Sequence, residues 1–81
     1  MLDQIKVMKN VVGTKQTLKM IKGGEAKIVF LANDVEKSIY DNIKEQCIEN
    51  NVDIVYVETM EELGKASGIS RRTATAAILN D

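Results

Sequence analysis

Three lysines occur at helical spacing in the first third of the chain. In an α-helix, residues four and then three positions apart lie on one side, so Lys15, Lys19 and Lys22 form one cationic stripe. Like charges at this spacing repel each other by roughly 0.2–0.5 kcal/mol per pair. A polyanion bound along the stripe would offset that repulsion. The alternative is an ordinary solvated helix face, since exposed lysines are common on helices.

The residues that open this helix carry groups suited to a phosphate or a base. Gly13 and Thr14 stand where the helix begins, and the first N–H groups of a helix have no intrahelical partner. With the positive end of the helix dipole, these groups can receive a phosphate or a base acceptor. Thr14 can cap the helix or donate a hydrogen bond, and Gln16 carries both a donor and an acceptor with which to read a base edge. A normal helix cap is the competing interpretation.

A second cationic cluster lies in a loop near the end of the chain. The loop comprises Ile69, Ser70, Arg71, Arg72 and Thr73. Adjacent arginines between hydroxyl groups suit phosphate contacts, and a guanidinium can also stack on a base. A solubilising turn is the alternative. In an α/β fold this loop can lie at the same edge of the sheet as the start of the first lysine-bearing helix, which would join both basic regions in one site.

Charge is segregated along the chain although the net charge is only −1. Residues 1–27 carry six lysines against two acids, a net of +4, and residues 28–64 carry two lysines against nine acids, a net of −7. Residues 65–81 carry three cations against one acid, a net of +2. Two basic ends around an acidic middle can present one cationic face to a polyanion even in a nearly neutral protein.

The composition disfavours catalytic and metal-binding functions. The lone Cys47 cannot form an internal disulfide, and one cysteine without any histidine effectively excludes a zinc site. Neither phosphate-binding glycine motif, G-x-G-x-x-G or G-x-x-x-x-G-K-[ST], occurs in the chain. No pair of residues resembles a catalytic dyad. We therefore expect a protein that is not an enzyme, with no catalytic residue, no metal and no cofactor.

Length and hydropathy point to one small domain. A chain of 81 residues can bury a single modest core, and 44% hydrophobic with 28% charged residues is typical of a globular protein. No apolar run resembles a signal peptide or approaches transmembrane length, so we expect a cytoplasmic protein without a membrane partner. The charged surface gives no reason to expect more than a monomer.

Hydrophobic periodicity predicts the elements that position the two basic regions. Helices are expected over residues 3–9, 14–22, 36–49 and 60–66, and strands over residues 11–12, 28–32, 54–57 and 74–79. Asn50-Asn51 should end the helix at 36–49, and Thr59 with Glu62 matches a capping box that opens the helix at 60–66. The unbroken apolar runs at 28–32 and 54–57 are typical of strands buried on both faces. Strands that alternate with helices predict an α/β fold, a three-layer α/β/α sandwich with a mixed four-stranded sheet in a single domain.

Two further residues have a functional and a structural interpretation. Asp34 follows a buried strand, where some α/β folds carry a phosphoacceptor or a metal-binding carboxylate, but Asn33-Asp34 is more simply the cap of the next helix. Cys47 shares an apolar helix face with Ile39 and Ile43, with Tyr40 and Ile48 beside them. We expect Cys47 to belong to the core, because no histidine is available as a base.

Three blocks of the sequence resemble the kink-turn-binding ribosomal protein family. The blocks are Gly13-Thr14-Lys15-Gln16-Thr17-Leu18-Lys19-Met20-Ile21-Lys22, Glu25 through Asp34, and Glu62-Leu63-Gly64-Lys65-Ala66-Ser67-Gly68. The family includes archaeal and eukaryotic large-subunit ribosomal proteins, small-nucleolar-RNA core proteins and small bacterial homologues. The resemblance implies that residues 1–81 form one α/β/α domain that binds a kink-turn, a bent RNA motif with tandem sheared G·A pairs.

The resemblance also implies roles for both basic regions. The helix start, Gly13 through Gln16, would read the guanine edges of the G·A pairs, with Lys19 and Lys22 on phosphates. The loop Ile69 through Thr73 would cover the extruded nucleotide of the bulge. Archaeal members usually have Asn-Glu where this chain has Lys15-Gln16. Because lysine donates but cannot accept a hydrogen bond, the site should depend more on charge here.

These observations predict a non-enzymatic protein that recognises kink-turn RNA, either ribosomal RNA or a riboswitch-type RNA, and that is associated with the ribosome. The first alternative is a ribosome-associated protein-interaction module that uses its acidic residues 34–62 and has only non-specific RNA affinity. The second is an α/β enzyme or receiver-like switch that uses Asp34.

Overall fold

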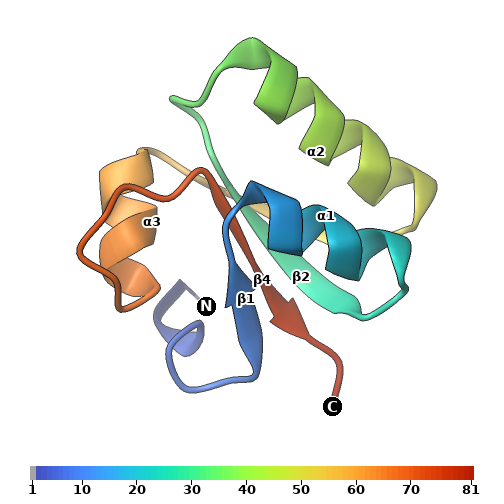
Figure 1. The fold of residues 1–81 in the computed structure, drawn as a ribbon, viewed down its shortest axis with the longest axis horizontal. Helices are drawn as coiled ribbons and strands as arrows, with labels where there is room; N and C mark the ends of the chain where they lie inside the picture. Colours follow the sequence, from blue (N-terminus) through green and yellow to red (C-terminus); the bar gives the residue numbers. More distant parts are fainter. Residues whose placement is uncertain (1) are drawn as a thin grey trace.

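A mixed four-stranded sheet lies between two helical layers in the computed structural model, which describes residues 2–81 (Figure 1). The elements in chain order are η1 (Leu2–Gln4), β1 (Asn10–Val12), α1 (Thr14–Lys22), β2 (Ala26–Ala32), α2 (Lys37–Glu49), β3 (Asp53–Val57), α3 (Met60–Ala66) and β4 (Thr75–Leu79). Helices α1 and α2 cover one face of the sheet, and α3 with η1 covers the other. The predicted three-layer α/β/α sandwich is confirmed.

The last strand enters the middle of the sheet. The strand order is β1-β4-β2-β3, with β4 antiparallel to both of its neighbours and β2 parallel to β3. All five residues of β4 are buried, as expected for a strand covered on both faces and paired on both edges. This order places the end of β1 beside the start of β4, where Val12 pairs with Ala76.

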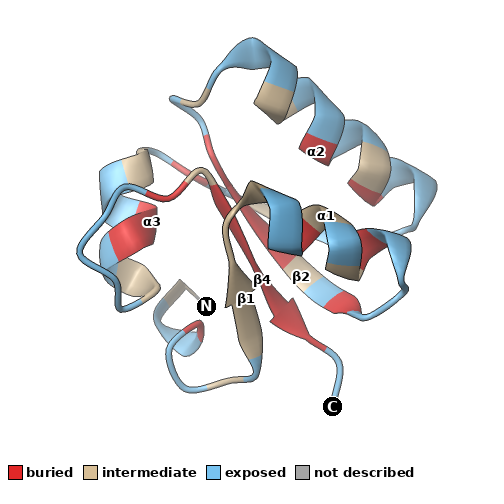
Figure 2. Cartoon of the chain, viewed as in Figure 1, coloured by how far each residue is buried: buried red, intermediate tan, exposed pale blue. Residues whose placement is uncertain are grey.

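Alternating residues of β2 and β4 belong to two separate cores. Figure 2 shows that β4 and most of β2 are buried. Val29 and Leu31 face α1 and α2, where they join Ile21, Ile43 and Cys47. The intervening Phe30 faces α3, together with Ile5, Leu63 and Ile78. Because successive strand residues point to opposite faces, each central strand contributes to both cores. The unbroken apolar run in β2 is thereby explained.

The end of α2 and the start of α3 lie at signals that are visible in the sequence. Asn50 donates its side-chain amide to the Gln46 carbonyl at 2.8 Å, and Asn51 adopts a φ of 56°, so the pair closes α2 as predicted. The Thr59 hydroxyl accepts a hydrogen bond from the Glu62 N–H at 3.1 Å, which confirms the predicted cap of α3.

Two predictions about element type and burial are wrong. Residues 3–9 do not form a helix: a 3₁₀ turn, Leu2–Gln4, leads into bends that the Asn10 side-chain amide holds by donating to the Ile5 and Met8 carbonyls at 2.7 and 2.9 Å. The Asn10 side chain thus takes carbonyl oxygens that a continuing helix would pair with its own N–H groups. Strand β3 lies at the sheet edge instead of being buried on both faces, and Tyr56 is 45% exposed.

The apolar face of α2 agrees with expectation at Ile43 and Cys47, which are buried, but not at Ile48. Ile48 is 66% exposed, because its position on the helix turns away from the sheet. Tyr40 stacks on Tyr56, with ring centroids 6.0 Å apart, and so links α2 to the edge strand.

Burial should make the Cys47 thiol unreactive in the folded protein. Desolvation raises its pKa to about 11, so the thiolate fraction near pH 8 is very small. We expect slow alkylation by iodoacetamide at pH 8 and fast alkylation in denaturant, measured by mass spectrometry. Since the unfolded thiol titrates near a pKa of about 8.5, folding stability should fall as pH rises from there towards the folded pKa. Equal alkylation rates with and without denaturant would contradict the buried placement.

Candidate nucleic-acid interface

The two basic regions predicted from sequence meet at the edge of the sheet where β1 ends and β4 begins. Strand β1 ends where β4 begins, and the Gly13 N–H donates to the Thr75 carbonyl at 2.9 Å. This contact joins the turn that opens α1 to the end of the loop at residues 67–74. The expectation that both loops lie at the same sheet edge is therefore confirmed.

Gly13 permits the turn between β1 and α1. Its φ of 104° lies in the region that side chains disfavour, and it serves as the N-cap of α1 without a side-chain cap. The predicted capping role of Thr14 is therefore wrong, since Thr14 is already the first helical residue. The helix begins with no side chain hydrogen-bonded at its cap, so its first N–H groups and positive dipole end remain suited to a ligand.

The loop at 67–74 is held against α3 by its backbone. The Thr73 N–H donates to the Met60 carbonyl at 3.0 Å, and the Ile69 N–H donates to the Gly64 carbonyl at 3.1 Å. Gly64 is buried in α3, and a Cβ at this position would collide with the carbonyl oxygen of Arg71. The absence of a side chain at Gly64 therefore lets the loop backbone lie directly on the helix.

Predicted residues from both regions line one surface cavity of about 320 Å³. Its lining residues include Gly13, Thr14, Ile69, Arg71, Arg72 and Thr73. The arginines and Ser70 are exposed, and Ile69 is 39% exposed. Thr73 differs from the expected surface contact, because it is only 4% exposed and its hydroxyl has no hydrogen-bond partner among the described residues. The other predicted loop residues are available to a ligand.

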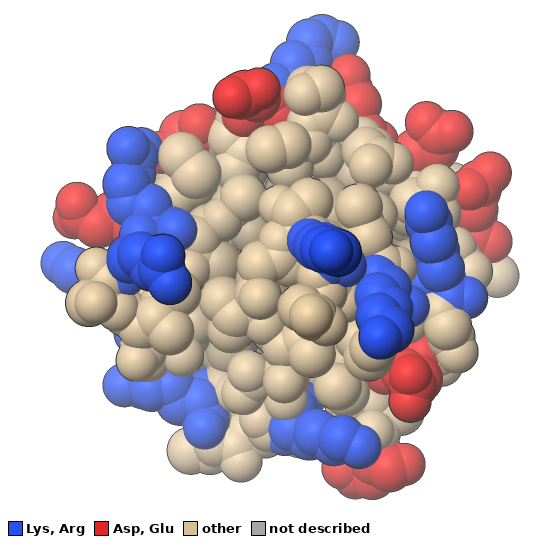
Figure 3. All heavy atoms as spheres, viewed as in Figure 1, with Lys and Arg blue, Asp and Glu red and all other residues tan. Residues whose placement is uncertain are grey.

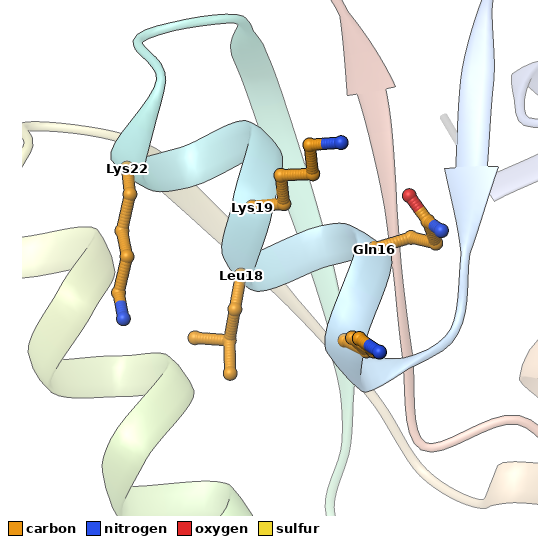
Figure 4. A pocket seen from close by; sticks show the side chains of 5 residues that line it. Gln16, Leu18, Lys19 and Lys22 are labelled. Atoms are coloured by element: carbon orange, nitrogen blue, oxygen red, sulfur yellow. The ribbon is translucent and has the colours of Figure 1, made fainter.

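The lysines and Gln16 line a second cavity, of about 600 Å³, on α1 (Figure 4). Lys15, Gln16, Lys19 and Lys22 are all exposed, whereas Leu18 is half-buried against the core. Figure 4 shows Gln16 and Lys19 extending to one side of α1, and Leu18 and Lys22 extending towards α2. The lysine side chains of the predicted stripe therefore diverge. Lys19 lies on the same side of α1 as Gln16, whereas Lys22 extends towards α2.

The space-filling view in Figure 3 shows how charge is distributed over this face of the molecule. Blue side chains lie over α1 and beside α3, on either side of an uncharged area, while most red side chains lie along the margin occupied by α2. The sequence order of basic and acidic segments thereby becomes a spatial separation. Such a field attracts a polyanion to the α1 side of the molecule.

The predicted role of Asn33-Asp34 as the cap of α2 is wrong. The N-cap of α2 is Glu36, without a side-chain cap. The Asp34 carboxylate instead accepts a hydrogen bond from the Met60 N–H, at 2.8 Å, and lies 3.6 Å from the Arg72 guanidinium. Asp34 can contact Met60 because β2 and β3 are parallel neighbours, so the residues that follow these two strands lie close together.

Sequence reasoning did not assign Gly64 or Asp34 to this site. A glycine inside the short helix α3 was a detectable signal, since an interior helical glycine usually has a packing reason. No local pattern distinguishes Asp34 from a cap of the next helix, because its partners lie 26 and 38 positions further along the chain.

Other kinds of site find no support in the part of the chain that the structure describes. Residues 2–81 contain no group of three or more cysteine and acidic side chains arranged to hold a metal ion. Among the same residues, no helix has the length and apolar character needed to cross a membrane.

Comparisons with known proteins agree on one family. The ribosomal protein L7Ae/L30e/S12e/Gadd45 family matches residues 3–81. An RNA-binding protein of Caldanaerobacter subterraneus subsp. tengcongensis is 46% identical over 69 residues, which are 85% of this chain and 84% of that protein. The large ribosomal subunit protein eL8 of Halobacterium salinarum is 41% identical over 68 residues, 83% of this chain and 57% of that protein.

A solved structure gives the same result for the fold. The Giardia lamblia 15.5kD RNA binding protein superposes with a TM-score of 0.89 at 25% identity, over 99% of this chain and 71% of that chain. The resemblance noted in the sequence therefore extends to the three-dimensional arrangement of nearly every residue.

Proposed function

Because the chain belongs to the ribosomal protein L7Ae/L30e/S12e/Gadd45 family, we propose that it is a non-enzymatic RNA-binding protein and that residues 1–81 form one kink-turn-binding domain. The relatives named above include an RNA-binding protein and a large-subunit ribosomal protein, which supports structured RNA as the ligand. Ribosomal RNA or a riboswitch-type RNA is the target class, and association with the ribosome would place the protein in the cytoplasm.

The convergence of the α1 start and the 67–74 loop carries this proposal. The hydrogen bond from Gly13 to Thr75 joins the two segments, and both present exposed cationic side chains. The N-terminal turn of α1 offers N–H donors and the Gln16 amide to base edges, while Lys19, Lys22 and both arginines reach phosphates. A bent RNA can contact both segments at once, which a straight duplex does less readily.

A paired titration tests the proposal. Fluorescence titrations at fixed salt would compare a kink-turn RNA with the same RNA after its sheared G·A pairs are replaced by Watson–Crick pairs. A strong preference for the intact motif is expected. Equal, weak binding to both RNAs would overturn kink-turn recognition and leave only general phosphate attraction.

The loop arginines should contribute through charge. Replacing Arg71→Ala and Arg72→Ala together is expected to weaken binding to every RNA and to flatten the log–log salt slope by about two units, because each phosphate contact contributes roughly −0.7 to −0.9. The slope is measured by titration at several salt concentrations. The matched control is Lys37→Ala with Lys44→Ala, two exposed cations on α2. An unchanged slope in the arginine variant would remove the loop from the interface.

One observation favours a second function, a protein-interaction module associated with the ribosome. The acidic segment at residues 34–62 carries two exposed large apolar side chains, Ile48 at 66% and Tyr56 at 45%. An acidic surface with apolar anchors suits a basic protein partner. If the paired titration above shows equal, weak binding to both RNAs, this second function would be favoured over kink-turn recognition.

A further inference from the structure

Asp34 makes two contacts that link three separate parts of the chain. One carboxylate oxygen, Oδ1, accepts a hydrogen bond from the Met60 N–H at the start of α3. The other, Oδ2, lies 3.6 Å from a guanidinium nitrogen of Arg72, in the loop at 67–74. The β2–α2 connection, α3 and the candidate RNA-binding loop therefore meet at one side chain.

We propose that Asp34 is a positioning residue of the RNA interface. It restrains Arg72 and thereby increases the preference of the protein for kink-turn RNA over the Watson–Crick-paired control RNA. The inference rests on the proposed function, in which Arg72 contacts RNA. The first contact orients the carboxylate, because a backbone N–H of a helix has a fixed position. The second contact then favours one position of the Arg72 guanidinium in the free protein.

The restraint acts through the geometry of the guanidinium. Arginine has five N–H donors in a planar fork, so pairing with Asp34 leaves other donors free for a phosphate. An RNA that presents a phosphate beside the paired guanidinium keeps the ion pair and gains a contact. An RNA that presents its phosphates elsewhere must first separate Arg72 from Asp34.

The size of the effect follows from exposure. The Arg72 and Asp34 side chains are 66% and 37% exposed, and ion pairs at such positions are weak. Breaking the pair therefore changes affinity by about fivefold or less. Discrimination by this route is a modest addition to base reading by α1.

Asp34→Asn is the decisive variant, because asparagine keeps an oxygen acceptor for the Met60 N–H but removes the charge that holds Arg72. We expect affinity for the Watson–Crick-paired control RNA to rise about two- to fivefold. Its salt slope should steepen by up to about one unit as Arg72 becomes free to contact phosphate. Affinity for the kink-turn RNA should change less, so that discrimination falls.

Two further variants separate this role from a general charge effect. Asp41→Asn removes one exposed carboxylate that pairs with Lys37 at 3.1 Å on α2, and it should leave discrimination unchanged. In an Arg72→Ala background, Asp34→Asn should no longer alter discrimination, because nothing remains to be released. A full effect of Asp34→Asn in that background, or an equal effect of Asp41→Asn, would overturn the inference.

Thermal unfolding separates positioning from folding. Asp34→Asn should keep a melting temperature close to that of the parent chain, whereas Asp34→Ala should lower it, since the Met60 N–H then loses its acceptor. If Arg72→Ala weakens RNA binding but Asp34→Asn leaves discrimination unchanged, the inference fails while the proposed function stands. If Arg72→Ala changes binding to neither RNA, the role of the loop fails and the inference falls with it.

Discussion

Replacing Lys15→Ala or Gln16→Ala is expected to reduce the preference for an intact kink-turn over its Watson–Crick-paired counterpart by about 1–3 kcal/mol, by analogy with side chains that read base edges. Both side chains are exposed in the first turn of α1, next to a cap that uses no side chain. Gln16 can donate and accept, so its loss removes both kinds of base contact, whereas Lys15 only donates.

The measurement is a pair of titrations at fixed salt, with the two RNAs described above. Lys27→Ala is the matched control, since Lys27 is exposed near the start of β2, at the sheet end opposite the Gly13–Thr75 contact. This control should lower affinity for both RNAs slightly and leave their ratio unchanged. If Lys15→Ala and Gln16→Ala weaken both RNAs equally, these residues contact phosphates and do not read bases.

Gly64→Ala is expected to weaken RNA binding without altering any side chain of the proposed interface. The new Cβ would collide with the Arg71 carbonyl oxygen, which is backbone and cannot move aside by a rotamer change. The loop must therefore lift from α3, at a cost of about 1–3 kcal/mol in folding stability, typical of overpacking. If the arginine contacts are lost with it, affinity should fall about tenfold or more, since hydrogen bonds to charged groups contribute roughly 1.5–3 kcal/mol.

The control for this variant is Gly24→Ala. Gly24 has a φ of 72° and open space around its Cα, so alanine there introduces backbone strain of roughly 1–2 kcal/mol but no collision. Gly24 follows α1 at the end remote from Gly13. Titration with kink-turn RNA, together with chemical denaturation, separates the two variants. A Gly64→Ala protein that binds as tightly as Gly24→Ala would contradict the idea that loop placement matters.

Much of the fold could be predicted because the signals that form its elements are local. The apolar run in β2, the Thr59 cap of α3 and the Asn50-Asn51 end of α2 each act within a few residues, and all were confirmed. The helix predicted at residues 3–9 is absent, because helical spacing alone does not decide against the turns that the Asn10 side chain holds through the Ile5 and Met8 carbonyls. The apolar run at 54–57 failed as a central strand because composition does not specify a place in the sheet.

The residues of the candidate site could be proposed from the sequence alone: a lysine-bearing helix that begins after Gly13, and an arginine-bearing loop that ends at Thr73. Their proximity depends on the folded sheet, in which β4 pairs directly with β1 and brings Thr75 to Gly13. Only the tertiary structure decided that Asp34 contacts Met60 and Arg72 in place of its own helix. Strand order and such distant contacts depend on how two cores pack around a sheet, which no local pattern of residues encodes.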